Sequence, residues 1–336
     1  MKALVTPEDS LPSSVRFSLI ELPDPTPPEG HDLLVRVEAV SINPVDAKLR
    51  RTGTTHPRIL GFDAAGTVEQ AGPLSGFQAG DTVYYAGEVQ RPGSNATRQL
   101  VDGRLVALRP GTLDQAHAAA LPLVSLTAWE LLFVRMPFQP DGQSGAGQSL
   151  LVIGAAGGVG SLAMQLGRLA GFHVIATASR PASIDWCRSM GAAAVINHHE
   201  PLAPQLAALG HAQVDVILNL ADTDAYWDQI GELIAPRGHV GLIVEPVGAL
   251  RIGDPYKAKS VSLHWEFMFT RSRYRTKDME EQQRILERVA LLVDSGDIKP
   301  PLTSAAGRIT AANLEAAHRQ IETGGTIGKL VLSGWE

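Results

Sequence analysis

The sequence predicts an α/β protein that combines a β-rich domain with a doubly wound parallel sheet. Three observations carry this prediction. A glycine-rich turn joins a strand to a helix near residue 157, strands and helices alternate from Ser149 onward, and short strand-like segments fill residues 1–126. A chain of 336 residues is also long for one hydrophobic core, so we expect two domains.

The composition is typical of a globular protein and excludes several classes of function. Hydrophobic residues make up 44% of the chain and charged residues 19%, and the net charge of -6 argues against a nucleic-acid partner. No apolar run has the length of a membrane span, and the N-terminus lacks the apolar core of a signal peptide, so we expect a cytoplasmic location and no membrane partner. The single cysteine, Cys187, excludes an internal disulfide and a cysteine-rich zinc site, and we interpret it as a buried thiol.

Residues 1–126 are predicted to form mainly strands. Segments such as 32–42 (DLLVRVEAVSI) and 81–87 (DTVYYAG) alternate apolar and polar residues and are separated by Gly and Pro. They predict a small barrel or a sandwich, and the pattern does not distinguish between the two.

From Ser149 onward, compact apolar segments alternate with amphipathic ones. Apolar runs of this kind are typical of strands that are buried on both faces, so the alternation predicts a parallel sheet. A charged helix (278–296) and a final strand (328–334) follow. The predicted strands of the sheet are 149–153, 173–178, 193–197, 215–220 and 239–244, and the predicted helices between them are 159–171, 183–191 and 224–234.

The glycine-rich turn is predicted to bind a dinucleotide. In the pattern G-x-G-x-x-G, Ala155 takes the first position, Gly157 the second and Gly160 the third, so alanine must make the first turn. Glycine at the second position lets a pyrophosphate approach the backbone, and N–H groups at the start of the helix face the phosphates. The alternative is a tight turn without a ligand. The residues predicted to contact the cofactor here are Ala155, Gly157, Gly158, Val159 and Gly160.

The end of the second strand favours NADPH over NADH. NAD sites usually place an acidic residue there, whereas this chain has Ser179 and Arg180, which suit a 2′-phosphate. The alternative is that Ser179 caps the next helix and Arg180 is only solvated.

Other strand ends supply further candidate cofactor contacts, because ligands bind at the carboxyl ends of the strands in such sheets. His198 is expected near the adenosine end, and Ala221 and Val244 follow the later strands. Lys329 is expected to approach the adenosine phosphate, or else to be an exposed lysine at the start of a strand.

Seven ordered blocks of the chain resemble the medium-chain dehydrogenase/reductase superfamily. They are most similar to its zinc-independent quinone oxidoreductases, including the branch called zinc-type alcohol dehydrogenase-like. The resemblance implies a GroES-like catalytic domain (1–126 and 264–336) and an inserted Rossmann NADP-binding domain (127–263). The blocks are SINPVDAKLRRTG, ILGFDAAGTVEQAG, GDTVYY, AALPLVSLTAWELL, GAAGGVGSLAMQL, SVSLHWEFMFTRS and TIGKLVL.

The resemblance implies four candidate catalytic residues. Asn43 is expected to face the nicotinamide and the substrate, or else to be a turn residue before Pro44, and Asp46 is expected to orient the same loop. Thr127 is expected to open a helix and hydrogen-bond the cofactor, or else to be an N-cap or interior hydroxyl. His56 matches a position where relatives carry Tyr, and we expect it to donate a proton or bind a quinone oxygen, unless it is a solvated loop residue.

The resemblance further predicts that the chain binds no zinc. Alcohol dehydrogenases of this superfamily carry a cysteine ligand where this chain has Asn43, and a His-Glu pair where it has Phe62-Asp63. Without a Lewis acid, an already electrophilic acceptor is favoured, so we expect a homodimeric NADPH-dependent reductase of quinones, enones or related activated carbonyl compounds. The alternatives are an enoyl reductase, acting on an α,β-unsaturated ketone or thioester, and a low-turnover NADPH-binding sensor or structural protein.

Overall fold

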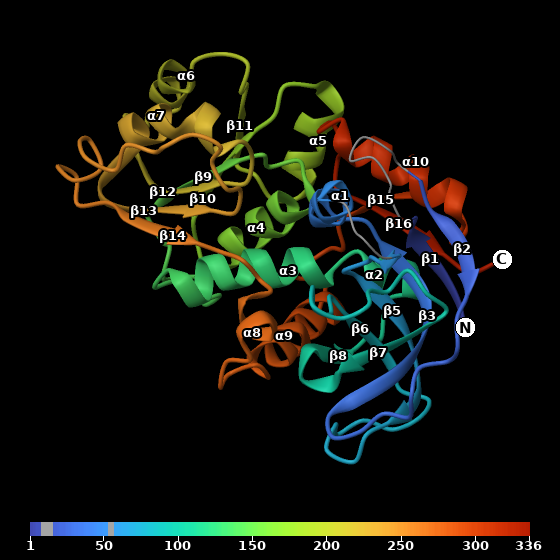
Figure 1. Ribbon diagram of the computed structural model, residues 1–336. Coiled ribbons are helices and arrows are strands. Elements are labelled where there is room, and N and C mark those ends of the chain that lie inside the picture. Colours follow the sequence, from blue (N-terminus) through green and yellow to red (C-terminus); the bar gives the residue numbers. More distant parts are fainter. Residues whose placement is uncertain (8–15, 53–56) are drawn as a thin grey trace. The chain divides into compact units, whose positions relative to one another are not determined.

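The computed structural model describes residues 1–7, 16–52 and 57–336, which form two compact units (Figure 1). One unit comprises Met1–Leu126 and Phe269–Glu336, and the other comprises Thr127–Met268. The predicted boundary between residues 263 and 264 would cut strand β14 (Ser262–Trp265). Because β14 is hydrogen-bonded to the preceding strand of the parallel sheet, residues 264–268 belong with the second unit.

The first unit is built on two sheets. The larger one has the strand order β15-β16-β3-β5-β6-β8, with β7 also paired to β3, and the smaller one has the order β2-β1-β4. Bulges in the pairing of β3 with β5 interrupt the register between them. The strands are β1 (Lys2–Thr6), β2 (Ser18–Glu21), β3 (Asp32–Ser41), β4 (Arg58–Ile59), β5 (Ala64–Ala71), β6 (Thr82–Tyr85), β7 (Arg98–Asp102), β8 (Val106–Leu108), β15 (Leu302–Ala305) and β16 (Lys329–Ser333).

Helices of the first unit pack on these sheets. The predicted charged helix at 278–296 is confirmed as α9 (Glu281–Asp294), whose apolar side buries Ile285, Leu286 and Val289. The spacing of these residues gives one apolar face along the helix. The other helices of this unit are α1 (Pro44–Arg51), the 3₁₀ helix η1 (Gly103–Leu105), α2 (Gln115–Ala119), α8 (Thr270–Tyr274) and α10 (Ala311–Glu322).

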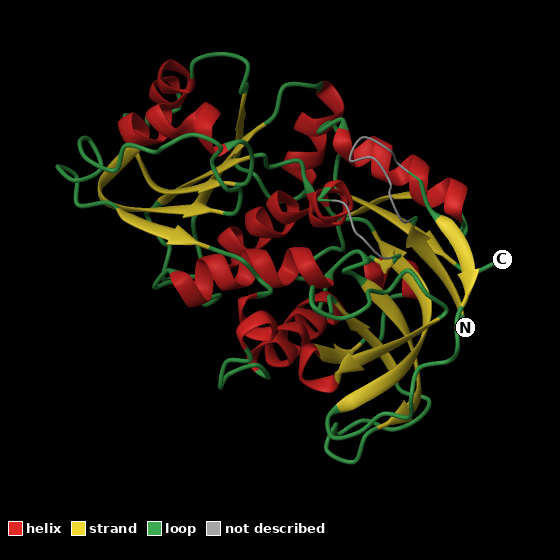
Figure 2. Cartoon of the chain, in the orientation of Figure 1, coloured by secondary structure: helices red, strands yellow, loops and turns green. Residues whose placement is uncertain are grey.

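The second unit is a doubly wound sheet of six parallel strands. The strand order is β11-β10-β9-β12-β13-β14. Along the chain, β10 and β11 are added on one side of β9, and β12, β13 and β14 on its other side, which is the order of a Rossmann fold. Helices cover both faces of this sheet (Figure 2), which explains why its strands are continuously apolar. All five predicted strands are confirmed, and β14 is an addition. The strands are β9 (Ser149–Ile153), β10 (His173–Thr177), β11 (Ala194–Ile196), β12 (Val214–Asn219), β13 (Ile234–Leu242) and β14.

The helix in which the chain passes from the first unit to the second corrects one residue prediction. Helix α3 begins at Pro122, a favourable residue for a first turn, and extends to Trp129. Thr127 therefore does not open a helix; it lies inside α3 and is buried, as in the alternative of an interior hydroxyl. The remaining helices are the π-helix η2 (Glu130–Arg135), α4 (Gly158–Leu169), α5 (Pro181–Ser189), α6 (Leu202–Ala208) and α7 (Thr223–Leu233).

The structure also describes the environment of the single cysteine and the length of the helices. Cys187 lies in α5 as a buried free thiol, and burial raises its pKa to about 11, which fits an inert residue. Among the described residues, no helix is both long and apolar enough to cross a membrane.

Candidate functional site

Three glycines with different roles build the turn between β9 and α4. Gly154 has a φ of +78°, in the left-handed region, and its N–H donates to Thr177 Oγ1 over 3.2 Å. A Cβ on Gly160 would lie 2.4 Å from the carbonyl oxygen of Ala155, so only glycine lets the helix start so close to the strand end. A Cβ on Gly157 would meet no atom closer than 3.4 Å, so this backbone is open to a ligand.

The position of Gly154 corrects the assignment of the first tight turn. Ala155 is fully buried, and the left-handed backbone belongs to the residue before it. A Cβ on Gly154 would lie 3.3 Å from the backbone carbon of Leu220, which follows the neighbouring strand β12. The signal in the sequence was a glycine directly after the apolar strand.

The start of α4 offers a binding surface for an anion. Its N-cap is Gly157, in an extended conformation, and the first helical turn contains Gly158, Val159 and Gly160. The first N–H groups of a helix have no partner within the helix, and the helix dipole places positive charge there. The turn therefore fits the pyrophosphate of a dinucleotide.

Ser179 and His198 are close together after β10 and β11. The Ser179 hydroxyl lies 3.4 Å from His198 Nε2. Burial lowers the pKa of His198, and the neighbouring His199 and Arg180 lower it further. The N-cap of α5 is Arg180, so the alternative that Ser179 caps this helix is wrong. A hydroxyl, an imidazole and a guanidinium group thus lie close together at the edge of the sheet formed by the carboxyl ends of its strands.

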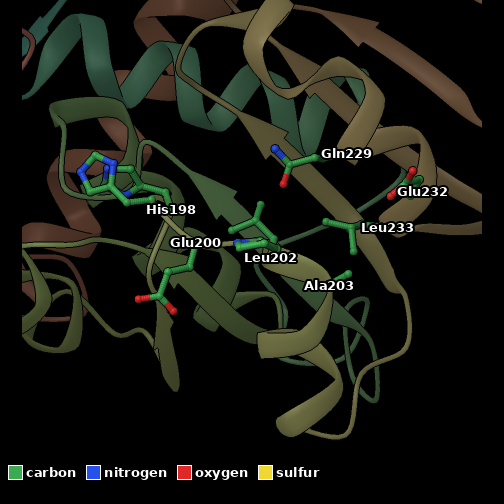
Figure 3. A pocket seen from close by; sticks show the side chains of 9 residues that line it. His198, Glu200, Leu202, Ala203, Gln229, Glu232 and Leu233 are labelled. Carbon is green, nitrogen blue, oxygen red and sulfur yellow. The ribbon is translucent and has the colours of Figure 1, made fainter.

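A pocket of about 340 Å³ adjoins this edge (Figure 3). Of the predicted cofactor residues, only His198 lines it, so the pocket does not outline the dinucleotide site. Its lining residues are His198, His199, Glu200, Pro201, Leu202, Ala203, Gln229, Glu232 and Leu233.

The ends of β12 and β13 bring Ala221 and Val244 to the same edge. The N–H of Ala221 donates to Asn219 Oδ1 over 3.3 Å, and the carbonyl of Val244 accepts from Thr223 Oγ1 over 2.5 Å. Since all strands of the sheet are parallel, these ends and the glycine turn share one edge, where such sheets bind their ligands.

In the first unit, Asn43 and Asp46 lie in a buried polar network. Asn43 is the N-cap of α1, immediately before Pro44. Asp46 Oδ2 accepts from the N–H of Asn43 over 2.8 Å, and its Oδ1 accepts from the N–H of Gly61 over 3.0 Å. The carboxylate of Asp46 therefore joins the start of α1 to the loop before β5, which fits the orienting role expected of it.

Two further residues complete this network. Lys329 Nζ contacts Asp63 Oδ2 at 2.8 Å, the carbonyl of Ile42 at 3.2 Å and the amide oxygen of Asn43. Asn43 Nδ2 donates to Asp63 Oδ2 over 2.8 Å. These acceptors match the three N–H donors of an ammonium group, so the structure does not support the predicted contact of Lys329 with a phosphate, and the expected exposed lysine is buried.

Burial dominates the electrostatics of the network. Burial, with a smaller contribution from the charge of Asp63, raises the pKa of Asp46 to about 7, although hydrogen bonds and the charge of Lys329 act in the opposite direction. Burial also raises the pKa of Asp63, which Lys329 and the hydrogen bond from Asn43 oppose. Sequence reasoning used Asp63 only as evidence against zinc and missed it as a partner of Lys329.

One predicted catalytic residue, His56, lies outside the described residues.

The donor set around Asn43 does not fit a zinc ion. Zinc takes thiolate, imidazole and carboxylate ligands, whereas Lys329 places an ammonium group beside Asp63. The neighbouring Phe62 contributes an apolar ring that packs edge-to-face on Phe269, with the ring centroids 5.4 Å apart. Within residues 1–7, 16–52 and 57–336, no three His, Cys, Asp or Glu side chains are grouped so that they could hold a metal ion.

Comparison with known proteins assigns the family. An alcohol dehydrogenase GroES-like domain model matches residues 29–120, and a zinc-binding dehydrogenase model matches residues 190–332. A zinc-type alcohol dehydrogenase-like protein from Staphylococcus aureus is 41% identical over 324 residues, which cover 94% of this chain and 95% of the relative. The chain belongs to the medium-chain dehydrogenase/reductase superfamily. It is an oxidoreductase of the quinone oxidoreductase-like branch.

Solved structures of this superfamily share the fold. A Rhizobium etli protein that was assigned to the zinc-dependent alcohol dehydrogenases is 45% identical, with a TM-score of 0.92 over 100% of this chain and 98% of the other. The Escherichia coli quinone oxidoreductase, solved with NADPH, has a TM-score of 0.82 over 99% of this chain and 100% of the other. At 22% identity, the second comparison shows the fold alone.

Proposed function

We propose that this oxidoreductase transfers a hydride from NADPH to a quinone or a related activated carbonyl compound, without zinc. The observation that carries the proposal is the pairing of an open phosphate-binding turn with Ser179, Arg180 and His198 at one edge of the parallel sheet. The fold can hold this cofactor, since the E. coli quinone oxidoreductase was solved with NADPH.

The residues after β10 support NADPH in preference to NADH. An NAD site usually places a carboxylate here for the ribose hydroxyls, but residues 177–180 read TASR. The guanidinium group of Arg180 would pair with a 2′-phosphate, and the Ser179 hydroxyl and the His198 ring would add hydrogen bonds. The first turn of α4 would hold the pyrophosphate.

When bound, NADPH would supply the hydride, and the side chains of this chain would bind and orient. Reduction of a quinone places negative charge on an oxygen atom, which hydrogen-bond donors can stabilise without a metal ion. Asn43 and Asp46 are proposed to shape the reacting end of the site, with Thr127 contributing a hydroxyl. The proton donor proposed from the sequence is His56.

The expected homodimer also stays a proposal. The edge strand β14 exposes Leu263 and Trp265, and Phe267 follows with 41% of its surface exposed. Edge strands with exposed apolar side chains favour pairing with another chain. Light scattering that gives the mass of one chain at micromolar concentration would contradict a dimer.

The cytoplasmic location, and the absence of nucleic-acid and membrane partners, likewise remain predictions.

The test of the proposal is NADPH oxidation by the purified protein with an ortho-quinone, with NADH in parallel. We expect fast quinone-dependent loss of NADPH, and slow loss of NADH. Faster turnover with an α,β-unsaturated ketone or thioester would favour the enoyl reductase. Tight NADPH binding without turnover on either acceptor would contradict the reductase and favour the sensor or structural protein.

A further inference from the structure

Four buried polar side chains from three segments of the chain meet in the first unit. Asn43 follows β3, Asp46 lies in α1, Asp63 precedes β5 and Lys329 begins β16. Each of them has at most 4% of its surface exposed. The antiparallel register places Val331 opposite Ser41, so it also brings Lys329 opposite Asn43. The pairing of β16 with β3 therefore places the ammonium group of Lys329 beside Asn43.

The hydrogen-bond donors and acceptors of the network pair with one another. Asp63 Oδ2 accepts from Lys329 and from Asn43, and Asp63 Oδ1 accepts from the N–H of Leu123 over 2.7 Å. The carboxamide of Asn43 donates to Asp63 and accepts from Lys329, so both of its ends are fixed. A metal ion at this point would face N–H donors and a positive charge in place of free lone pairs.

We propose that the ammonium group of Lys329 is a built-in cation that takes the place of a catalytic metal ion: it compensates the charge of Asp63, fixes the carboxamide of Asn43 and keeps zinc out. Lys329 is then a positioning residue that acts through Asn43. Its effect on catalysis rests on the proposed function, whereas its effect on stability and metal exclusion does not.

The charges explain why the residues depend on one another. A buried carboxylate without a partner is strongly unfavourable, so removing only the lysine should destabilise the unit. Removing both charges should cost much less, because no unpaired charge remains buried. Asn43 would keep its place before Pro44 in either variant, but its carboxamide would lose the contact that fixes its oxygen.

The first experiment is chemical rescue of Lys329→Ala. The deleted group is equivalent to propylammonium, so the protein is refolded and melted with propylammonium, methylammonium or bulky tert-butylammonium chloride. We expect a melting temperature lowered by on the order of 5–10 °C. Propylammonium should restore most of this loss, methylammonium less and tert-butylammonium none. Lys277→Met, at an exposed position of the same unit, is the control and should melt like the wild type.

The second experiment addresses zinc directly. Wild-type protein is incubated with zinc sulfate, dialysed and analysed for metal by atomic emission. We expect much less than one zinc per chain. One zinc per chain in the wild type, lost in Asp63→Asn, would overturn the proposal, as would a Lys329→Ala variant that no amine stabilises.

If Lys329→Ala does not fold, the double variant Asp63→Asn/Lys329→Met decides the question. We expect it to fold, to bind NADPH with wild-type affinity and to have a kcat reduced by about 10-fold or more. A wild-type kcat in this variant would overturn the positioning role. Failure of quinone turnover in the wild type, with the melting and zinc results as expected, would remove the proposed function and leave the built-in cation in place.

Discussion

Two glycines of the turn between β9 and α4 are expected to have different roles: Gly160 allows the helix to pack, and Gly157 leaves room for a ligand. In Gly160→Ala, the new Cβ would lie 2.4 Å from a backbone oxygen, which cannot move without shifting the strand end. We expect a loss of stability of about 1–3 kcal/mol, measured by denaturant unfolding. In Gly157→Ala the Cβ meets no close atom, so stability should be retained.

Gly157→Ala should instead weaken cofactor binding, because the methyl group would occupy the side from which the pyrophosphate approaches. We expect the Kd for NADPH, measured by calorimetry, to rise on the order of 10-fold, equivalent to about 1.4 kcal/mol. Unchanged affinity in a folded Gly157→Ala protein would show that the phosphates bind elsewhere.

Arg180 is the residue that should distinguish the two cofactors. Removing a charged partner of a phosphate costs about 1.5–3 kcal/mol, so Arg180→Ala should raise the KM for NADPH roughly 10- to 100-fold. The KM for NADH should change little, because NADH lacks the 2′-phosphate. Arg188→Ala, at an exposed position of the same helix, is the control. Equal effects on both cofactors would contradict the assignment.

Residue identities alone predicted some of the site and not the rest. The glycines and the Ser179-Arg180 pair stand in a short motif after a strand, so their neighbours in the sequence indicate their surroundings. The contacts of Lys329 with Asn43 and Asp63 join residues more than 260 positions apart. No local pattern encodes such a contact, because it depends on the pairing of β16 with β3.

At the level of elements, the packing of α10 predicts an acid-sensitive stability. His318 on α10 is fully buried, and its ring centroid lies 4.8 Å from that of Phe17. Within the described residues, neither ring nitrogen has a hydrogen-bond partner. Burial, with a smaller contribution from the charge of Arg50, lowers the pKa of His318 to about 4. The folded protein therefore binds this proton less readily than the unfolded chain.

The direction of the pH effect follows from this difference. Above the unfolded pKa of 6.5 the ring is neutral in both states, and its contribution to stability is fully present. As the pH falls from 6.5 towards 4, the unfolded chain gains the proton first, and about 3 kcal/mol of unfolding free energy is lost. His318→Phe should remove this part of the slope in urea unfolding, whereas His117→Phe, at an exposed ring, should largely keep it. The same slope in His318→Phe and in the wild type would contradict the assignment.

Hydrophobic periodicity predicted the strands and helices that have strong local patterns. The five buried strands and the charged helix are long apolar or amphipathic segments, so their sequences alone identify them. Strand β14 was missed because it has no continuous apolar run: it lies at the edge of the sheet, where the exposed Leu263 and Trp265 alternate with polar residues. The start of α3 was placed too late, because its first turn is as apolar as the preceding segment.

At the level of the whole molecule, the β-α alternation predicted the doubly wound parallel sheet. It could not distinguish a barrel from a sandwich in the first unit, whose two sheets depend on pairings between distant strands. The family resemblance implied that the C-terminal segment belongs with the N-terminal one. The pairing of β16 with β3 is the physical reason for this arrangement.

The central claim is that hydride passes from NADPH to a quinone without a metal ion. The most direct measurement is anaerobic single-turnover kinetics with NADPH and C4-deuterated NADPH, on chelator-treated protein of known zinc content. The account predicts a primary isotope effect on quinone reduction, and a rate that is unchanged by the chelator or by added zinc. A rate that is lost with the chelator and restored by zinc would contradict it.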